Sequence, residues 1–190
     1  MQKDTWLRFL IASLCSLNNI VSPPQNVARI HKIDEEWGIF SNFAHTPLQV
    51  EGKTFDTSER LFQVLKMATK ESQTSVYEVK GNPKMRAKHI SKVDPEQIRS
   101  DWPEIIVDAM KFCLMTKYEQ SAEFRDTLVR SRGMVIVEDQ TSFSRKNADT
   151  WGVKLQDGKY VGPNLLGRLL MELREGGGLE YSIPEGMLVM

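Results

Sequence analysis

The chain combines stretches in which apolar residues recur at helical spacing with short runs that favour strands. The first helical stretch covers residues 4–17, with apolar positions at Trp6, Phe9, Leu10, Leu14 and Leu17. Polar residues and two prolines follow over residues 18–26 and indicate a linker. We therefore predict an N-terminal helical extension and linker over residues 1–26, a main domain over residues 27–176 and a C-terminal tail over residues 177–190.

The main domain begins with patterns typical of strands. Residues 27–33 predict a short strand, and residues 38–43 predict a strand that enters a loop. Residues 48–55 alternate around Gly52, as the two arms of a β-hairpin do.

Helices are predicted over much of the remaining chain. Asp56 can cap a helix and Glu59 can fold back on it, which predicts a helix that runs to about Thr69. Residues 133–138 are the clearest later strand. The other predicted helices are two or three short ones within residues 73–99, one over about 101–118, one around 121–131, and one over 163–176.

Composition and charge narrow the class of protein. The chain has 190 residues, of which 41% are hydrophobic and 26% charged, so it can bury a core and is not a disordered or collagen-like sequence. Its 25 basic and 25 acidic residues cancel, which argues against a surface that coats polyanions. A local basic site remains compatible with this balance.

The expected compartment is cytoplasmic and reducing. Cys15 and Cys113 cannot form a disulfide scaffold, and neither belongs to a Cys-x-x-Cys pair. No run of about 18 apolar residues exists to span a membrane. Residues 9–15, behind Lys3 and Arg8, also fit a short signal-peptide core, which is the alternative to an amphipathic helix.

Common catalytic motifs are missing from the sequence. It has no Walker loop, no dinucleotide fingerprint and no nucleophile elbow. The histidines at positions 31, 45 and 89 are scattered, and no cluster with cysteines or acids has zinc spacing. We therefore expect no metal and no cofactor, with an oxygen-only metal site as the open alternative.

One polar helix face is the first candidate for chemistry. Glu59, Gln63 and Lys66 stand at i, i+4 and i+7, so they share a face of the predicted helix. Such a face is commonly a solvated surface. The alternative is a carboxylate, an amide and an ammonium that converge on a polar ligand, where the carboxylate can move a proton or stabilise a cation.

Two further groups of residues are weaker candidates. Trp102 and Trp151 are either core residues or platforms that stack on a planar base, and Phe40 and Phe43 flank a short polar step. The segment 162–167, followed by Arg168 and Arg174, is either an ordinary helix start or a phosphate site at a helix N-terminus.

Taken together, these motifs resemble the NADAR domain family of YbiA-like N-glycosidases, which is associated with NAD and ADP-ribose. The resemblance covers roughly residues 30–175 and rests on five motifs in order: Trp37–Phe43, Thr57–Lys66, Trp102 with its helix, Val137-Glu138 with Asp149–Gly152, and Asn164–Arg174. It implies a single α+β domain, mostly helical, with a small β-sheet. It implies no metal, no membrane and no stable protein partner.

The resemblance also implies an activity and a set of site residues. The activity is hydrolysis of the bond between a base nitrogen and the ribose anomeric carbon, without a cofactor. Its motif positions imply Glu59 and Lys66 as catalytic residues. Those it implies as substrate-binding are Asn42, Phe43, Gln63, Trp102, Glu138, Asp149, Trp151, Asn164 and Arg174. The acid at position 149 stands two residues before the tryptophan, whereas the family usually has it three residues before.

The implied function leaves alternatives open. Removal of ADP-ribose from ADP-ribosylated guanine, in nucleic acid or as a nucleotide, is the first hypothesis. Clearance of phosphoribosylamino intermediates of riboflavin synthesis is the second, and a non-catalytic module that binds ADP-ribose or NAD is the third. Glu59 is expected to stabilise the oxocarbenium ion, whereas Lys66 acts either as a substrate-binding cation or as a Schiff-base amine.

Overall fold

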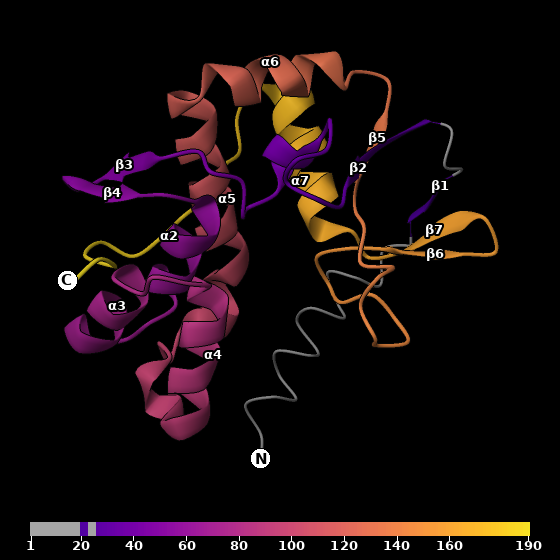
Figure 1. Cartoon of the computed structure of the whole chain (residues 1–190). Helices are drawn as coiled ribbons and strands as arrows, with labels where there is room; N and C mark the ends of the chain where they lie inside the picture. The colour runs from indigo at the N-terminus through magenta and orange to yellow at the C-terminus, as the bar shows by residue number, and fades with distance from the viewer. Residues whose placement is uncertain (1–19, 23–25) are drawn as a thin grey trace. The chain divides into compact units, whose positions relative to one another are not determined.

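The computed structural model describes residues 20–22 and 26–190, and these form two compact units (Figure 1). The first unit contains the described residues up to Ser41 and residues 123–179. The second contains residues 42–122 and 180–190. The helix predicted at residues 4–17 lies outside the described residues.

The first unit holds two small sheets. Strands β2 (Val27–Ile30) and β5 (Val135–Glu138) pair in parallel, so their carboxyl ends meet at one edge. The other sheet is antiparallel, in the order β1 (Ile20–Ser22), β7 (Lys159–Gly162) and β6 (Lys154–Gln156). Helices α6 (Ala122–Arg130) and α7 (Leu165–Gly176) flank β5 along the chain. The strand expected at residues 133–138 and both helices are confirmed.

The hairpin formed by β6 and β7 was not predicted, although the sequence carries a signal for it. Asp157 and Gly158 both have positive φ angles, 48° and 75°, and join the two strands as a tight two-residue turn. Such turns favour Asp-Gly because glycine reaches positive φ without steric cost. Lys154 is buried and Leu155 exposed, which hides the usual apolar alternation.

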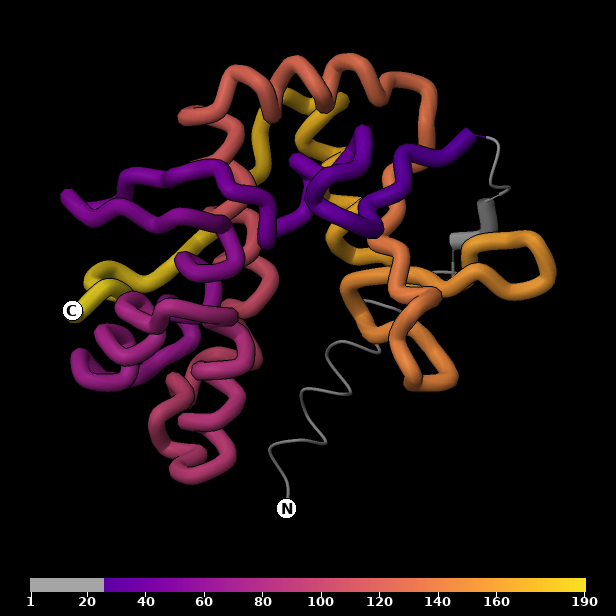
Figure 2. Tube along the Cα trace, in the orientation of Figure 1, coloured from indigo at the N-terminus to yellow at the C-terminus, as the bar shows by residue number. Residues whose placement is uncertain are grey.

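Helix α7 packs closely on β5 in both the ribbon and the tube (Figure 2). A Cβ atom at Gly167 would lie 2.1 Å from the carbonyl oxygen of Ile136, so only glycine fits there. Asn164, which precedes the helix, adopts a left-handed conformation with φ 54°, a region that asparagine tolerates better than most residues. Sequence-local geometry therefore fixes how this helix meets the strand.

The segment at residues 38–43 does not form the predicted strand. Gly38–Phe40 is a short 3-10 helix (η2), held by the bonds from Phe40 N to Trp37 O and from Ser41 N to Gly38 O. A Cβ atom at position 38 would lie 2.3 Å from the carbonyl oxygen of Ile33. The tight turn back onto the end of β2 therefore replaces an extended strand.

The second unit consists of a hairpin and a group of helices. Strands β3 (Leu48–Val50) and β4 (Lys53–Phe55) form the predicted hairpin, with Glu51 and Gly52 at positive φ. The longest helix is α5 (Trp102–Gln120), as expected. The other elements are α2 (Ser58–Leu65), α3 (Lys70–Tyr77), α4 (Pro83–Val93) and the 3-10 helix η3 (Pro95–Gln97).

Helix α2 starts and ends differently from the prediction. Its N-cap is Thr57, whose hydroxyl accepts the N–H of Arg60 at 3.1 Å, whereas Asp56 binds the Arg60 guanidinium at 2.6 Å. The helix stops at Leu65, because Thr69 caps the next helix instead. Arg60 also donates to backbone carbonyls at the end of α3, the closest at 2.8 Å from Tyr77, and so ties α2 to α3.

The C-terminal residues 180–190 pack on the second unit (Figure 2). Gln73 of α3 donates to the carbonyl of Met187 at 2.6 Å and accepts the N–H of Val189 at 2.8 Å. Across both units, the predicted α+β class with mostly helical content is confirmed, and the strands lie in three small sheets rather than one.

Candidate functional site

The polar face predicted on α2 is buried in the structure. Glu59 is 5% exposed and Gln63 is 6% exposed, and every residue of the helix is buried. The Gln63 amide donates to a Glu59 carboxylate oxygen at 2.9 Å. Lys66 lies at the C-terminal end of the same helix and is partly buried. This burial excludes the interpretation of a merely solvated face, because burying a carboxylate costs free energy that solubility does not require.

The charges of this face shift each other's ionisation. Burial raises the pKa of Glu59, while Lys84, the Gln63 hydrogen bond and Lys66 oppose the rise. Burial also lowers the pKa of Lys66, with Lys84 acting in the same direction and Glu59 against it. Perturbed ionisation of this kind is typical of catalytic groups, though ion pairs that only stabilise a fold also produce it.

Lys84 was missed by the sequence analysis. It lies in the first turn of α4, where Asn82 caps the helix by accepting from the Lys84 N–H at 2.9 Å. No helical spacing relates Lys84 to Glu59, because the two residues stand on different helices. The capping signal Asn82-Pro83 predicted the helix correctly but gave no hint that its first lysine faces the carboxylate.

Asn42 and Ser58 add two polar atoms next to this face. The backbone carbonyl of Asn42 accepts the N–H of Glu59 at 2.8 Å, which places Asn42 beside the start of α2. Its side-chain N–H contacts the sulfur of Met110 at 3.2 Å. The Asn42 side-chain oxygen and the Ser58 hydroxyl are buried and have no hydrogen-bond partner among the described residues. Such atoms are available to a ligand.

The aromatic residues of this unit have mixed exposure. Trp102 is 5% exposed and its ring lies 5.1 Å from that of Phe62, so it packs in the core beside α2. Phe43 follows Asn42 and is exposed. The second unit therefore brings together the predicted residues Asn42, Phe43, Glu59, Gln63, Lys66 and Trp102.

The other predicted site residues lie in the first unit, and two of them hold backbone in place. Asn164 is fully buried, donating to the carbonyl of Ile136 at 2.7 Å and accepting the N–H of Glu138 at 3.0 Å. Arg174 donates to the carbonyls of Ser131 and Met134 at 2.7 and 2.9 Å. These bonds favour a positioning role for both residues over direct contact with a substrate.

Asp149 and Trp151 form a loop after β5. The Asp149 carboxylate accepts from Gln140, from Arg145 and from the backbone N–H of Trp151, the last at 3.0 Å. Trp151 and Glu138 are partly exposed. The loop acid is thus engaged by its neighbours, and substrate contact by Asp149, Glu138 and Trp151 stays a prediction.

Two searches over the described residues gave negative results. Within residues 20–22 and 26–190, no group of three or more histidines, cysteines and acids is placed to hold a metal ion. In the same part of the chain, no helix is long and apolar enough to cross a membrane.

The relationship to known proteins can be stated from these residues outward. The pattern of the NADAR domain matches residues 30–176. The chain belongs to the NADAR domain family. The match runs through both units and contains all eleven predicted site residues.

Characterised relatives carry names of enzymes. N-glycosidase YbiA of Escherichia coli is 32% identical over 154 residues, which covers 81% of this chain and 90% of that protein. A riboflavin biosynthesis protein of Vibrio vulnificus is 28% identical over 171 residues, covering 89% of this chain but 43% of that protein. The predicted class, a hydrolase of N-glycosyl bonds, is confirmed by this relationship.

A solved structure shows the same fold. The NMR structure of the Escherichia coli protein YbiA matches with a TM-score of 0.64 and 29% identity, covering 84% of this chain and 88% of that one. The predicted NADAR-type α+β fold is therefore confirmed.

Proposed function

We propose that this protein removes ADP-ribose from ADP-ribosylated guanine by hydrolysing the bond between the base nitrogen and the ribose anomeric carbon. The observation that carries the proposal is the buried group of Glu59, Gln63 and Lys66 on α2, with Asn42 beside it. The names of the N-glycosidase relatives support the reaction class. The choice of guanine-linked ADP-ribose as substrate rests on the family's association with ADP-ribose.

In the proposed reaction Glu59 acts on the anomeric carbon. As the C1′–N bond breaks, positive charge develops at C1′, and a carboxylate held in a site of low polarity stabilises it. Glu59 then takes a proton from the attacking water, whose oxygen bonds to C1′, while the base nitrogen leaves with a proton. Gln63, which donates to Glu59, holds the carboxylate in position.

Lys66 has two roles that the structure separates by chemistry. As a cation it binds a phosphate or a ribose hydroxyl. As a neutral amine it attacks C1′ of the ring-opened sugar, the base nitrogen leaves with a proton, and water then hydrolyses the C1′–Nζ imine to release the sugar aldehyde and free lysine. Burial and Lys84 both lower the pKa of Lys66, which favours the neutral amine and therefore the covalent role.

A second candidate substrate is a phosphoribosylamino intermediate of riboflavin synthesis. The riboflavin biosynthesis proteins of Vibrio vulnificus and Zea mays are both 28% identical to this chain over the matched residues. A mononucleotide substrate would use the same C1′–N hydrolysis and the same residues. Near-neutral net charge is compatible with either substrate, since a single nucleotide needs only a few cations.

The substrate experiment compares the two candidates directly. The full-length protein is incubated with ADP-ribosyl-guanine DNA and, separately, with a phosphoribosylaminopyrimidine, and mass spectrometry follows loss of the base. We expect release of ADP-ribose from the DNA. Turnover of only the pyrimidine would transfer the proposal to the second candidate, and binding without turnover of either would favour a module that only holds ADP-ribose.

The role of Lys66 is tested by trapping. Borohydride added during turnover should reduce the C1′–Nζ imine to a stable adduct, and digestion should locate it at Lys66. Lys66→Arg should lose activity, because a guanidinium stays protonated and cannot act as the amine. Absence of an adduct together with substantial activity in Lys66→Arg would assign Lys66 as a cation only.

A further inference from the structure

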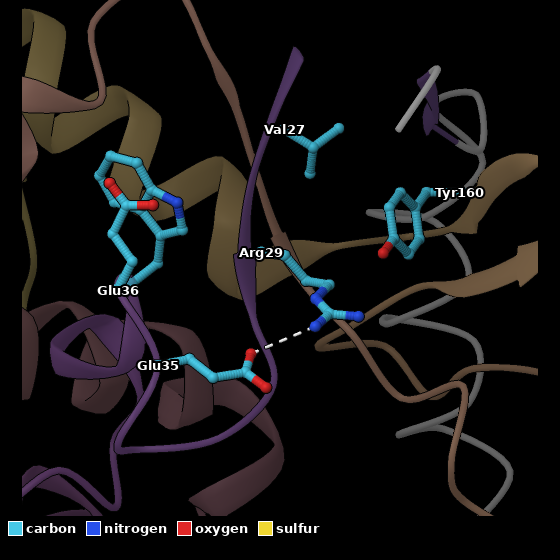
Figure 3. Close-up of a pocket in the computed structure, with 6 residues that line it drawn as sticks. Val27, Arg29, Glu35, Glu36 and Tyr160 are labelled. Atoms are coloured by element: carbon cyan, nitrogen blue, oxygen red, sulfur yellow. Dashed lines mark hydrogen bonds and ion pairs between the residues drawn. The ribbon is translucent and has the colours of Figure 1, made fainter. Parts of the chain in front are cut away.

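A pocket of about 370 Å³ lies in the first unit, at the carboxyl ends of the parallel strands β2 and β5 (Figure 3). Arg29 comes from β2, Asp139 directly follows β5, and Glu35 comes from the loop after β2. The side chains that line it are Val27, Arg29, Glu35, Glu36, Trp37 and Tyr160. None of the predicted site residues lines it, so neither the sequence analysis nor the proposed function uses this pocket.

Arg29 is held in place by three neighbours. Its guanidinium donates to Glu35 at 3.3 Å, as Figure 3 shows, and lies 3.7 Å from Asp139. Tyr160 donates its hydroxyl to Asp139 at 3.4 Å and accepts from Arg29. Arg29 nevertheless remains 45% exposed, so part of its planar set of donors faces the pocket.

The lining charges define the kind of ligand that fits. Glu35, Glu36 and the buried Asp139 outnumber the single cation Arg29, so the pocket disfavours phosphate and other anions. The Glu35 oxygen that does not bind Arg29 stands beside the guanidinium and can accept an N–H. A guanidinium donor next to a carboxylate acceptor matches a neutral group that presents a carbonyl oxygen beside N–H donors.

We propose that this pocket binds the 2-amino-4-oxopyrimidine edge of a base. Arg29 donates to the ring carbonyl, and the Glu35 carboxylate accepts from the adjacent ring N–H and the exocyclic amino group. Glu36 supplies a second acceptor at the pocket wall. Because Arg29 is fixed by Glu35, Asp139 and Tyr160 before a ligand arrives, little side-chain entropy is lost on binding.

This inference rests on the proposed function and narrows its substrates. Guanine carries the carbonyl, ring N–H and amino group along one edge. An aminopyrimidinone such as a riboflavin precursor carries the same three groups on a single ring. The two substrate candidates therefore share the one edge that this pocket complements, whereas adenine presents an amino group where the carbonyl should be.

The ligand test measures binding to the full-length protein by calorimetry. Guanosine, adenosine and 2,6-diaminopyrimidin-4-one are the probes. We expect guanosine to bind at least ~10-fold more tightly than adenosine, because a site built for hydrogen bonds rejects an analogue with the wrong polarity. The tighter of guanosine and the pyrimidinone indicates which source the pocket serves. Equal binding of guanosine and adenosine, or no binding of guanosine and the pyrimidinone, would overturn the proposal.

A matched pair of variants tests the residues. Glu35→Gln keeps an acceptor for Arg29 but removes the carboxylate, and should weaken guanosine binding at least ~10-fold with an unchanged Tm. Glu172→Gln, an exposed glutamate on α7 of the same unit, is the control and should bind normally. Unchanged binding in Glu35→Gln would contradict the assignment.

The variant Glu59→Gln keeps this test separate from the proposed reaction. Glu59 does not line the pocket, so this variant should retain guanosine binding while it loses hydrolysis. Loss of hydrolysis with the expected guanosine preference upholds the pocket whatever the substrate assay shows. Normal hydrolysis of guanine-linked substrate by Glu35→Gln, with unchanged KM, would leave the proposed function standing and remove the pocket from substrate recognition.

Discussion

At the scale of single residues, Glu59 and Lys117 are buried ionisable groups of the second unit with different consequences. Glu59 lies against Gln63 and beside Asn42, two polar side chains that the sequence analysis also selected. Lys117 of α5 is fully buried and belongs to no predicted motif. The contrast shows that burial of a charge marks a candidate site only when other polar groups converge on it.

Replacing Glu59 by glutamine should lower kcat/KM by at least ~100-fold, the usual scale for a catalytic acid or base. The amide keeps the size of the side chain, so the fold and Tm should be retained. Burial raises the pKa of Glu59, and the acid limb of the wild-type pH profile should therefore lie above the ordinary range of a glutamate.

The control for this prediction is Glu71→Gln, an exposed glutamate in the first turn of α3. It should keep wild-type turnover under the same assay. Near-normal turnover in purified, folded Glu59→Gln would remove Glu59 from the mechanism.

Lys117 makes the stability of the protein depend on pH. Burial lowers its pKa from 10.5 to about 7, so the unfolded chain binds more protons than the folded one between these values. Stability from this group therefore rises as pH rises from about 7 toward the unfolded pKa. Between about pH 7 and about pH 9 the gain is about 2 kcal/mol, at ~1.4 kcal/mol for each pH unit above the folded pKa.

Lys117→Met removes this titration. We expect the wild type to gain several degrees in Tm relative to the variant between those two pH values, at ~2–4 °C per kcal/mol for a chain of this size. Comparing the two proteins at each pH cancels the titration of all other groups. A Tm difference that does not change with pH would show that Lys117 is charged in the folded protein.

At the scale of helices and strands, local signals predicted most elements and failed where tertiary contacts decide. The hairpin at β3 and β4 and the helices α3 to α7 follow from turns, caps and apolar spacing. The N-cap of α2 was assigned to Asp56, but the guanidinium of Arg60 takes that carboxylate and leaves Thr57 as the cap. Competition for one side chain is invisible in sequence spacing.

The site shows the same division. Glu59, Gln63 and Lys66 were predictable because one helix carries them at fixed spacing. Lys84 stands on a different helix, so only the packing of α4 against α2 reveals it. Asn164 fell on a family motif, yet its bonds to β5 show why that position needs asparagine.

Asn164 joins α7 to β5, and its loss should weaken that junction. Asn164→Ala removes two buried hydrogen bonds and places alanine at φ 54°, which should cost about 2–4 kcal/mol. Asn164→Gly restores freedom at positive φ and should recover part of the loss. The exposed residue Asn147 provides the control, since Asn147→Ala should leave Tm unchanged. Equal Tm values for wild type and Asn164→Ala would contradict this role.

At the scale of the whole molecule, the family domain and the folded structure have different limits. The NADAR match covers residues 30–176. Ordered contacts extend past both ends of it. Strand β1 pairs with β7, through Val21 opposite Val161 for example, and Gln73 binds the backbone of the C-terminal residues. The predicted boundary at residue 26 therefore separates β1 from the sheet to which it belongs.

Two shortened chains distinguish the contributions of the N-terminal region. A chain that begins at residue 20 keeps β1, and we expect its Tm and turnover to equal those of the full chain. A chain that begins at residue 25 loses β1 and leaves one edge of β7 without its partner. It should remain active, because every predicted site residue lies within residues 30–176, but its Tm should fall by a few degrees.

The competing expectation is that Trp6, Phe9 and Leu10 pack on the core and complete it. In that case the chain that begins at residue 20 would already aggregate or lose about ten degrees in Tm, a loss of several kcal/mol. Comparing the two shortened chains by calorimetry separates these contributions, since only the second lacks β1. Equal loss in both would assign the stability to residues 1–19, and a loss confined to the second would assign it to the pairing of β1 with β7.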